Sequence, residues 1–140
     1  MKTRSIRLKD VQRQKYVLDL KGVRMGKAIS TIAKLLLGKN KVNAVRYIPI
    51  IDEVYLLNAS EVDFHPTKGD KKYYWHSMYP GGLKSDTLEN MLENKTEYII
   101  RRSIRGMLPK NRFGRICLDA VKFVEKTKQM PKDVIEYKIK

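Results

Sequence analysis

Two short stretches combine residue types that carry out chemistry in other proteins. His76 and Ser77 provide a base and a hydroxyl nucleophile, but adjacent side chains point in different directions and no acid is evidently placed to orient the imidazole. Residues 22–28 place two glycines and a lysine just before a helical pattern, where a phosphate-binding loop would lie. Three residues rather than four separate the glycines, and Ala28 offers no hydroxyl for magnesium. We therefore expect no enzyme, and the loop is either a phosphate contact or a plain tight turn.

Residues 105–115 are suited to hold an anion, because their charged side chains are all basic. Gly106 and Gly114 permit positive φ and close approach of another backbone. Pro109 fixes its own φ and keeps the residue before it out of the helical region. A rigid basic turn suits a nucleic-acid backbone, whose negative charges are regularly placed. The side chains expected to face the nucleic acid are Arg105, Lys110, Asn111, Arg112 and Arg115, and those expected to face the core are Met107 and Leu108.

Aromatic rings and lysines also gather between residues 71 and 84. Aromatic faces stack on bases or riboses while lysines meet phosphates. We expect Tyr73 and Trp75 to pack a strand into the core, because alternate aromatic residues suit a half-buried strand. The residues expected to contact the nucleic acid are Lys71, Lys72, Tyr74, His76, Tyr79 and Lys84.

The charge of the chain points to the same class of partner. The 140 residues carry 30 Lys and Arg against 15 Asp and Glu, a net charge of +15 that would repel itself in a compact isolated protein. The net charge is +10 over residues 1–41 and +8 over residues 101–140, but −3 over residues 42–100. We expect a polyanionic partner that is contacted mainly through the two ends of the chain.

The order of the apolar segments favours an α/β fold with a parallel sheet, since strand, helix and strand follow one another. A helix begins near Met25 and ends at Gly38, with apolar residues every three or four positions. Asp86 can cap a further helix, with Glu89 at the capping-box distance. The other predicted elements are strands over residues 16–20, 53–59 and 121–124, helices over 86–92, 97–107 and 116–120, and a turn-rich segment over 60–84.

The chain is long enough for one domain with a real core, since 42% of its residues are hydrophobic. We predict a basic N-terminal extension over residues 1–15, a single domain over 16–125, and a basic tail over 126–140 that orders only against a partner. No apolar run is long enough to span a membrane, and residues 1–16 lack the apolar core of a secretory signal.

The single cysteine and the remaining histidine are assigned no chemistry. Cys117 lies between apolar neighbours and is interpreted as a buried structural thiol. His65 precedes a proline and is interpreted as a loop residue, because no second ligand stands at helical or turn spacing. We expect neither a metal nor a cofactor.

Three separated blocks resemble the family of the universal large-subunit ribosomal protein thirteen, and the resemblance covers roughly residues 15–124. The blocks are residues 25–30 through 37–39, then Asn58 and Ala59 with Tyr74, His76, Gly81 and Gly82, and finally residues 106–110 with Gly114 and Arg115. The last block is the most specific of the three. Their order and spacing agree with the family.

The resemblance implies a three-layer α/β/α fold around a mostly parallel four-stranded sheet. It also implies a non-enzymatic role, in which the protein binds large-subunit rRNA and supports subunit assembly and translation beside neighbouring large-subunit proteins. Carried over by position, it adds RNA contacts at Lys27, Lys34, Lys39, Lys41, Gly81 and Gly82. Lys27 stands where the family has arginine and so lacks the planar fork for a bidentate phosphate contact.

The C-terminal residues lack the histidine-rich, glutamine-proline ending of that family, so contacts made by that ending are not carried over. This divergence favours an organellar ribosome, and the mitochondrial matrix is preferred over a bacterial cytoplasm or a plastid. Two alternatives stay open. One is an RNA-dependent enzyme that uses Lys27 or the pair His76 and Ser77, and the other is a free regulatory RNA-binding module outside the ribosome.

Overall fold

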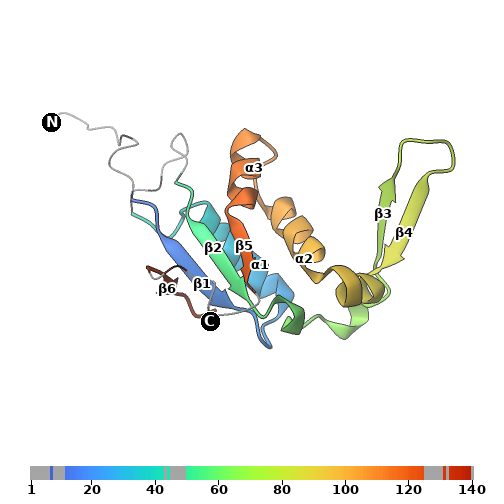
Figure 1. The fold of residues 1–140 in the computed structure, drawn as a ribbon, viewed down its shortest axis with the longest axis horizontal. Helices are drawn as coiled ribbons and strands as arrows, with labels where there is room; N and C mark the ends of the chain where they lie inside the picture. Colours follow the sequence, from blue (N-terminus) through green and yellow to red (C-terminus); the bar gives the residue numbers. More distant parts are fainter. Residues whose placement is uncertain are drawn as a thin grey trace.

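The computed structural model describes residues 7, 12–42, 44, 50–124, 131 and 133–139. They form a four-stranded sheet with helices packed on it and a hairpin that projects away from it (Figure 1). The strand order is β5 (Val121–Val124), β2 (Glu53–Leu57), β1 (Lys15–Asp19) and β6 (Ile135–Glu136), and every pair is parallel. The predicted α/β fold with a parallel sheet is confirmed.

The central strands are buried on both faces, as their apolar runs indicate. Leu18 and Leu56 lie opposite each other in the register and belong to the main core. Val17 and Tyr55 also lie opposite each other, but they belong to a small cluster on the other face. The strands predicted at residues 16–20, 53–59 and 121–124 are confirmed to within two residues at each end.

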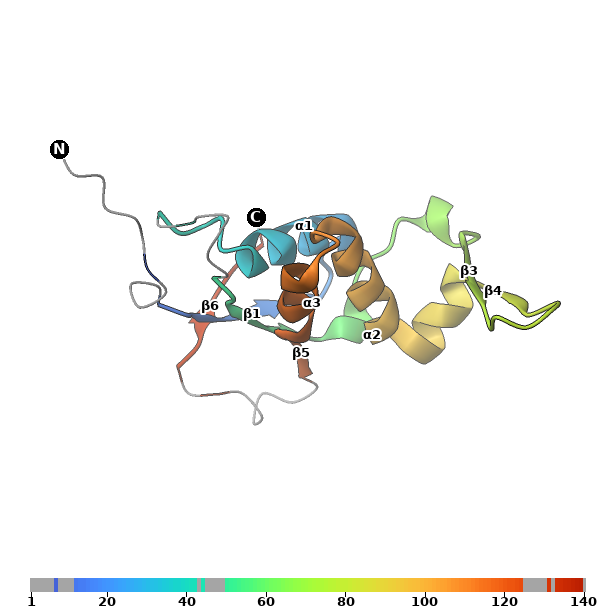
Figure 2. The same ribbon diagram turned by 90° about the horizontal axis from the view of Figure 1, so that it is seen from above.

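Three helices pack on one face of the sheet: α1 (Met25–Leu36), α2 (Leu88–Met107) and α3 (Arg112–Asp119) (Figure 2). Ile32 of α1, Ile104 of α2 and Cys117 of α3 meet in the main core. Among the described residues the other face carries no helix, and Val134 packs there against Val17. The resemblance implies helices on both faces of the sheet, and in the described residues the helices lie on one face.

Gly38 ends α1 as its sequence position indicates. Its φ is +65°, its amide donates to the carbonyl of Leu35 (2.9 Å), and the amide of Lys39 donates to that of Lys34 (3.0 Å). These two bonds form a Schellman motif, which satisfies carbonyls that the helix leaves unpaired.

The helices predicted at residues 86–92 and 97–107 form the single element α2, which is kinked where the prediction leaves a gap. Lys95 has non-helical torsions (φ −147°, ψ 47°). The predicted cap at Asp86 is wrong, because Thr87 occupies the N-cap position and Asp86 belongs to a strand. Leu108 follows α2 in an extended conformation (φ −88°, ψ 154°), which is the restriction that Pro109 imposes on it.

The segment predicted to be turn-rich contains two short 3-10 helices, η2 (Ala59–Glu61) and η3 (Pro66–Lys68), and a hairpin. Its strands are β3 (Lys72–His76) and β4 (Leu83–Thr87), which are antiparallel. A second core of Leu88, Met91 and Ile99 holds the base of the hairpin.

Part of the C-terminal tail packs on the sheet, contrary to the prediction that it orders only against a partner. β6 pairs with β1, and Tyr137 meets Tyr16 edge to face at a centroid distance of 6.3 Å. Ile135 and Tyr137 stay exposed in these contacts, while Val134 and Ile139 pack against the clusters of the sheet. Most of residues 1–15 lies outside the described residues. No helix in the described part of the chain is long and apolar enough to cross a membrane.

Candidate nucleic-acid interface

The candidate residues fall into three groups that the fold keeps apart. The turn group is Arg105, Lys110, Asn111, Arg112 and Arg115. The hairpin group is Lys71, Lys72, Tyr74, His76, Tyr79, Gly81, Gly82 and Lys84, and the helix group is Lys27, Lys34, Lys39 and Lys41. The turn group and the hairpin group lie at opposite ends of α2, whose 20 residues span at most roughly 30 Å (Figure 1). No single pocket collects the three groups, so they suit an extended partner.

The turn between α2 and α3 is rigid because its backbone packs against itself. Leu108 is buried in the main core, and a Cβ added at Gly114 would overlap the carbonyl oxygen of Pro109. Asn111 caps α3, since its Oδ1 accepts a hydrogen bond from the amide of Gly114 (2.9 Å). The close approach expected at Gly114 is confirmed. Asn111, predicted as an RNA contact, also has a structural role that the sequence interpretation missed.

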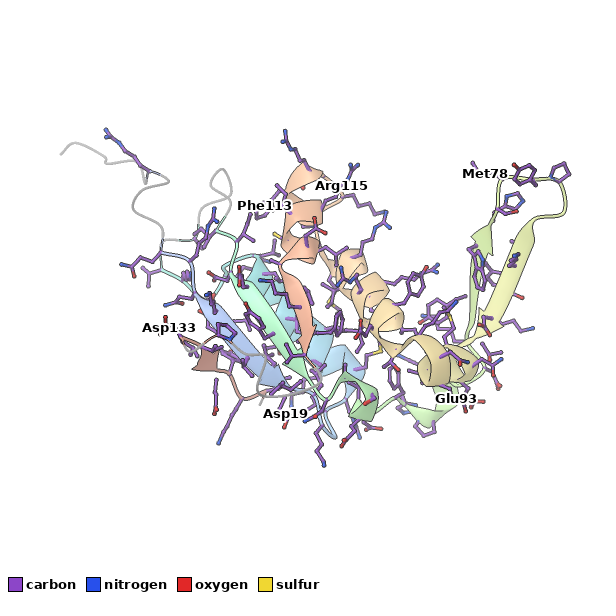
Figure 3. All side chains as sticks on the ribbon, viewed as in Figure 1. Asp19, Met78, Glu93, Phe113, Arg115 and Asp133 are labelled. Atoms are coloured by element: carbon purple, nitrogen blue, oxygen red, sulfur yellow. The ribbon has the colours of Figure 1, made fainter. Side chains whose placement is uncertain are left out.

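The basic side chains of the turn group are exposed, and among the described residues none of them takes part in an ion pair. Arg115 and Phe113 lie on opposite sides of α3 in the upper part of the molecule in Figure 3. The acids Asp19 and Glu93 lie on the lower edge of the same view. The turn group therefore presents positive charge that no nearby ion pair neutralises.

Two expectations about this turn are wrong. Met107 does not face the core, since 49% of it is exposed. It lies in the last turn of α2, where Ile104 points inward, and Leu108 directly after the helix is buried as expected. Gly106 needs neither positive φ nor close backbone approach, because its φ is not positive and a Cβ there would meet nothing within 4 Å.

The register of the hairpin divides its residues between two faces. Tyr74 pairs with Ser85 and His76 with Leu83, so these residues share one face with Lys72. The alternate residues Tyr73 and Trp75 form the other face with their partners, which include Lys84. The structure thus brings Lys72, Tyr74 and His76 together on one face of the hairpin and places Lys84 on the opposite face.

The prediction that Tyr73 and Trp75 pack into the core holds only for Tyr73. Tyr73 is half-buried against the second core, and Lys71 Nζ and the Arg102 guanidinium lie 5.2 and 5.1 Å from its ring centroid. Trp75 is 39% exposed and belongs to neither core. The hairpin projects beyond α2, so only its base has a core to pack against (Figure 1).

The tip of the hairpin is apolar and exposed. Met78 and Tyr79 are 88% and 75% exposed, and Met78 lies at the upper end of the hairpin in Figure 3. Gly81 has a φ of +69°, and a Cβ at Gly82 would lie 2.8 Å from the carbonyl oxygen of Tyr79. Both glycines, predicted as RNA contacts, are therefore also required by the turn itself.

His76 serves the tip as well, because its Nδ1 accepts a hydrogen bond from the amide of Met78 (2.9 Å). His65 likewise accepts from the amide of Thr67 (3.3 Å), as a loop residue does. The described residues contain no group of three His, Cys, Asp or Glu side chains that could hold a metal ion.

The helix group is dispersed along α1 and the loop after it. Lys27 and Lys34 are exposed two turns apart on the same side of α1, and Lys39 is exposed beyond its end. Lys41 differs, because its Nζ lies 2.5 Å from Oδ1 of the buried Asp52 and 2.7 Å from the carbonyl oxygen of Gln12. Its ammonium is therefore committed to the fold.

The shifted pKa values of Cys117 and Glu53 follow from their surroundings in the fold. Burial raises the pKa of the Cys117 thiol from 9.0 to about 11, and its Sγ lies 3.7 Å from the carbonyl oxygen of Leu36. The predicted buried structural thiol is confirmed.

The hydroxyl of Tyr55 (2.7 Å) and the ammonium of Lys122 (3.1 Å) both donate to Glu53, and they lower the pKa of that carboxyl. The cluster connects β2, which carries Glu53 and Tyr55, with β5, which carries Lys122.

Sequence reasoning passed over Arg24 and Lys68. Both line one cavity together with Lys27 and Lys71. Arg24 stands directly before α1, and Lys68 stands three residues before Lys71. Lys68, Lys71 and Lys72 form a basic run after Pro66, and Arg24 stands close to Lys27, but only the folded chain brings the two segments together.

Comparison with known proteins identifies the family. The model of the ribosomal protein L13 family matches residues 13–130. The chain belongs to this family. A large ribosomal subunit protein uL13 of Aquifex aeolicus is 45% identical over 123 residues, which cover 87% of this chain and 85% of the relative. The uL13 protein of Thermotoga petrophila is 44% identical over 122 residues (86% and 82%), and that of Listeria welshimeri is 45% identical over 107 residues (76% and 74%).

Membership of the L13 family makes the protein a structural component of the ribosome and not an enzyme. The alternative of an RNA-dependent enzyme is not favoured. The relatives are bacterial, so the preference for a mitochondrial ribosome finds no support in the comparisons.

Proposed function

We propose that this L13-family chain is a structural protein of the large ribosomal subunit, that it binds large-subunit rRNA, and that it supports assembly of that subunit. The observation that carries the RNA-binding role is the turn group. Lys110 is exposed on the turn before α3, and Arg112 and Arg115 are exposed in the first turn of α3, whose start is fixed by the contact between Pro109 and Gly114. Because the backbone that carries these cations is already fixed, binding a phosphate requires only their side chains to become ordered, so the segment is suited to a folded RNA backbone.

The hairpin group supplies a second kind of contact. Tyr74 and His76 offer rings on one face of β3, and Lys72 stands beside them. Rings stack on unpaired bases while the ammonium meets a phosphate, a combination found where proteins bind single-stranded RNA. Because the turn group lies at the other end of α2, one protein can hold two RNA segments in a fixed relation. Neighbouring large-subunit proteins are the other proposed partners.

The test is a filter-binding titration of the full chain with large-subunit rRNA at several salt concentrations. About eight phosphate contacts predict a slope of log affinity against log salt near −7, from roughly −0.9 per phosphate. An affinity without salt dependence would contradict the proposal. Cell fractionation adds a second test, since the protein should sediment with large subunits, and a wholly free pool would instead indicate a regulatory module.

A further inference from the structure

A cavity of about 860 Å³ opens where α1 begins, and no predicted RNA contact other than Lys27 and Lys71 reaches it. Its walls come from the start of α1, the segment around η3, the base of the hairpin and α2. Met25 and Phe64 line it and pack against both the main core and the second core. The cavity therefore lies at the junction between the sheet and the hairpin.

The rim of this cavity is strongly basic. Arg24, Lys27, Lys68 and Lys71 line it, against a single carboxylate, that of Asp63. All four cations are exposed, and none belongs to the ion pairs found among the described residues. Lys71 is held 5.2 Å from the ring centroid of Tyr73, at the wall of the cavity. The four cations and one carboxylate leave a net charge of +3, which attracts a ligand with two or more negative charges.

The inner wall is apolar and partly aromatic. Phe64 and Tyr73 contribute rings, and Met25, Ile29 and Leu88 contribute aliphatic surface. Ligand sites in proteins are typically concavities of about 300–1,000 Å³ with apolar and aromatic walls and a few polar groups. An apolar wall with a ring of cations suits a flat aromatic group that carries phosphates.

Two backbone amides at the start of α1 are bonded within the fold. The amide of Met25 donates to the carbonyl oxygen of Asp63 (2.9 Å), and the amide of Lys27 donates to the carbonyl oxygen of Arg24 (3.1 Å). We therefore assign the charge recognition to the basic side chains of the rim. Gly26 leaves room for a ligand, because a Cβ there would meet nothing within 4 Å.

We propose that this cavity receives one unpaired nucleotide that is turned out of the bound RNA. The base lies against the wall of Phe64 and Met25, and the flanking phosphates lie at Arg24, Lys27, Lys68 and Lys71. This inference rests on the proposed rRNA binding and adds a specific site to it. Enzymes and RNA-binding modules read single bases in this way, because an unstacked base exposes both its face and its edges.

The decisive variant is Gly26→Leu, which fills open space in the cavity without removing a charge. The torsions of Gly26 lie in the helical region, so leucine is compatible with the backbone. Asn94→Leu is the matched control, since it places the same side chain at an exposed position of α2 outside the cavity. Thermal melts of both variants check that the fold is retained.

Two readouts follow the nucleotide in complexes of the full chain with large-subunit rRNA. Chemical acylation of 2′-hydroxyls should show one nucleotide that becomes hyper-reactive on binding, and ultraviolet crosslinking should join a nucleotide to the peptide containing Phe64 or Tyr73. Gly26→Leu should abolish both signals and weaken binding by about 5- to 150-fold, the range for loss of one base stack, with an unchanged salt slope. Asn94→Leu should leave both signals in place.

The outcomes separate this inference from the proposed function. If the wild type binds rRNA with strong salt dependence but Gly26→Leu changes neither signal, the cavity proposal is wrong and the rRNA-binding role stands. If the wild type does not bind rRNA, the role itself fails. Titration with free AMP and UMP gives the last arm: tight binding of a mononucleotide, with no adduct in the RNA complex, would mark a small-ligand site and overturn the proposal.

Discussion

Gly114 lies directly against the carbonyl oxygen of Pro109, so that α3 starts in contact with the turn that precedes it. The contact is between two backbones, and neither can move aside as a flexible side chain would. The amide of Gly114 is also bonded to Asn111, which fixes the glycine from its other side. This contact fixes the backbone that carries the exposed cations of the turn group.

Substitution of this glycine should therefore be costly. We expect Gly114→Ala to lower the free energy of unfolding by about 1–3 kcal/mol, the range for overpacking a tight site. Gly106→Ala is the control, because its Cβ meets nothing within 4 Å, and there alanine should stabilise the helix by up to about 1 kcal/mol. Urea denaturation measures both. Equal stabilities of the two variants would refute the role given to the contact.

The turn group should dominate the salt dependence of RNA binding. Replacing both Lys110 and Arg115 with glutamine removes two phosphate contacts and should reduce the salt slope by about two. The control is the double change Lys95→Gln and Lys138→Gln, at exposed cations outside the three groups. Filter binding at several salt concentrations measures the salt slope of each double variant. An identical loss of slope in both double variants would indicate that net charge, not position, governs binding.

Lys41 and Lys39 should behave differently although they are neighbours. Lys41→Met leaves the buried Asp52 without its cation and should cost about 3–5 kcal/mol of stability. Lys39→Met removes an exposed charge and should change stability by less than about 0.5 kcal/mol. The salt slope of RNA binding should fall by about one for Lys39→Met and should not fall for Lys41→Met. The reverse pattern would place Lys41 in the interface.

The only tryptophan provides a probe of the hairpin. Trp75 is 39% exposed in the free protein, so its fluorescence should change when bases stack on the hairpin. Inorganic polyphosphate offers charges without bases, and it should bind the turn group while leaving the emission unchanged. A titration with rRNA and with polyphosphate compares the two. An unchanged Trp75 emission at saturating rRNA would show that no base stacks on the face of the hairpin that carries Trp75.

Cys117 should make the protein sensitive to alkaline pH. Its pKa is raised from 9.0 to about 11 by burial, so folding favours the protonated thiol. The resulting stability is complete below pH 9 and is lost as pH rises towards 11, by about 2–3 kcal/mol. Chemical denaturation of the wild type and of Cys117→Ala over this range isolates the thiol. Parallel pH profiles of the two proteins would show that the thiolate is tolerated.

The sheet and its first helix could be predicted because their signals are local. Val54, Tyr55 and Leu56 form an apolar run that only a strand buried on both faces explains. Gly38 marks the end of α1 through its own torsions. The turn before α3 was predicted only in part: Pro109 acts on Leu108 as expected, but α3 begins at Arg112, inside the segment predicted as a turn and four residues before the helix predicted at 116–120.

What the sequence did not show depends on contacts between distant residues. Trp75 has the alternation of a core strand, but the hairpin extends past the helix that would cover it. Lys41 has the composition of a surface cation, and only the fold reveals Asp52 beside it. The cavity at Arg24 and Lys68 joins two segments about forty residues apart, roughly the length of a complete βαβ unit.

The pairing of β6 with β1 has a consequence for the order of events during synthesis. Among the strands of the described residues β1 is made first and β6 last, so the edge of β1 that β6 covers stays unpaired until residues 135–136 have been made. An unpaired strand edge is a template for association with other chains. A nascent chain of this protein therefore benefits from an early partner at that edge, before its own C-terminal strand arrives.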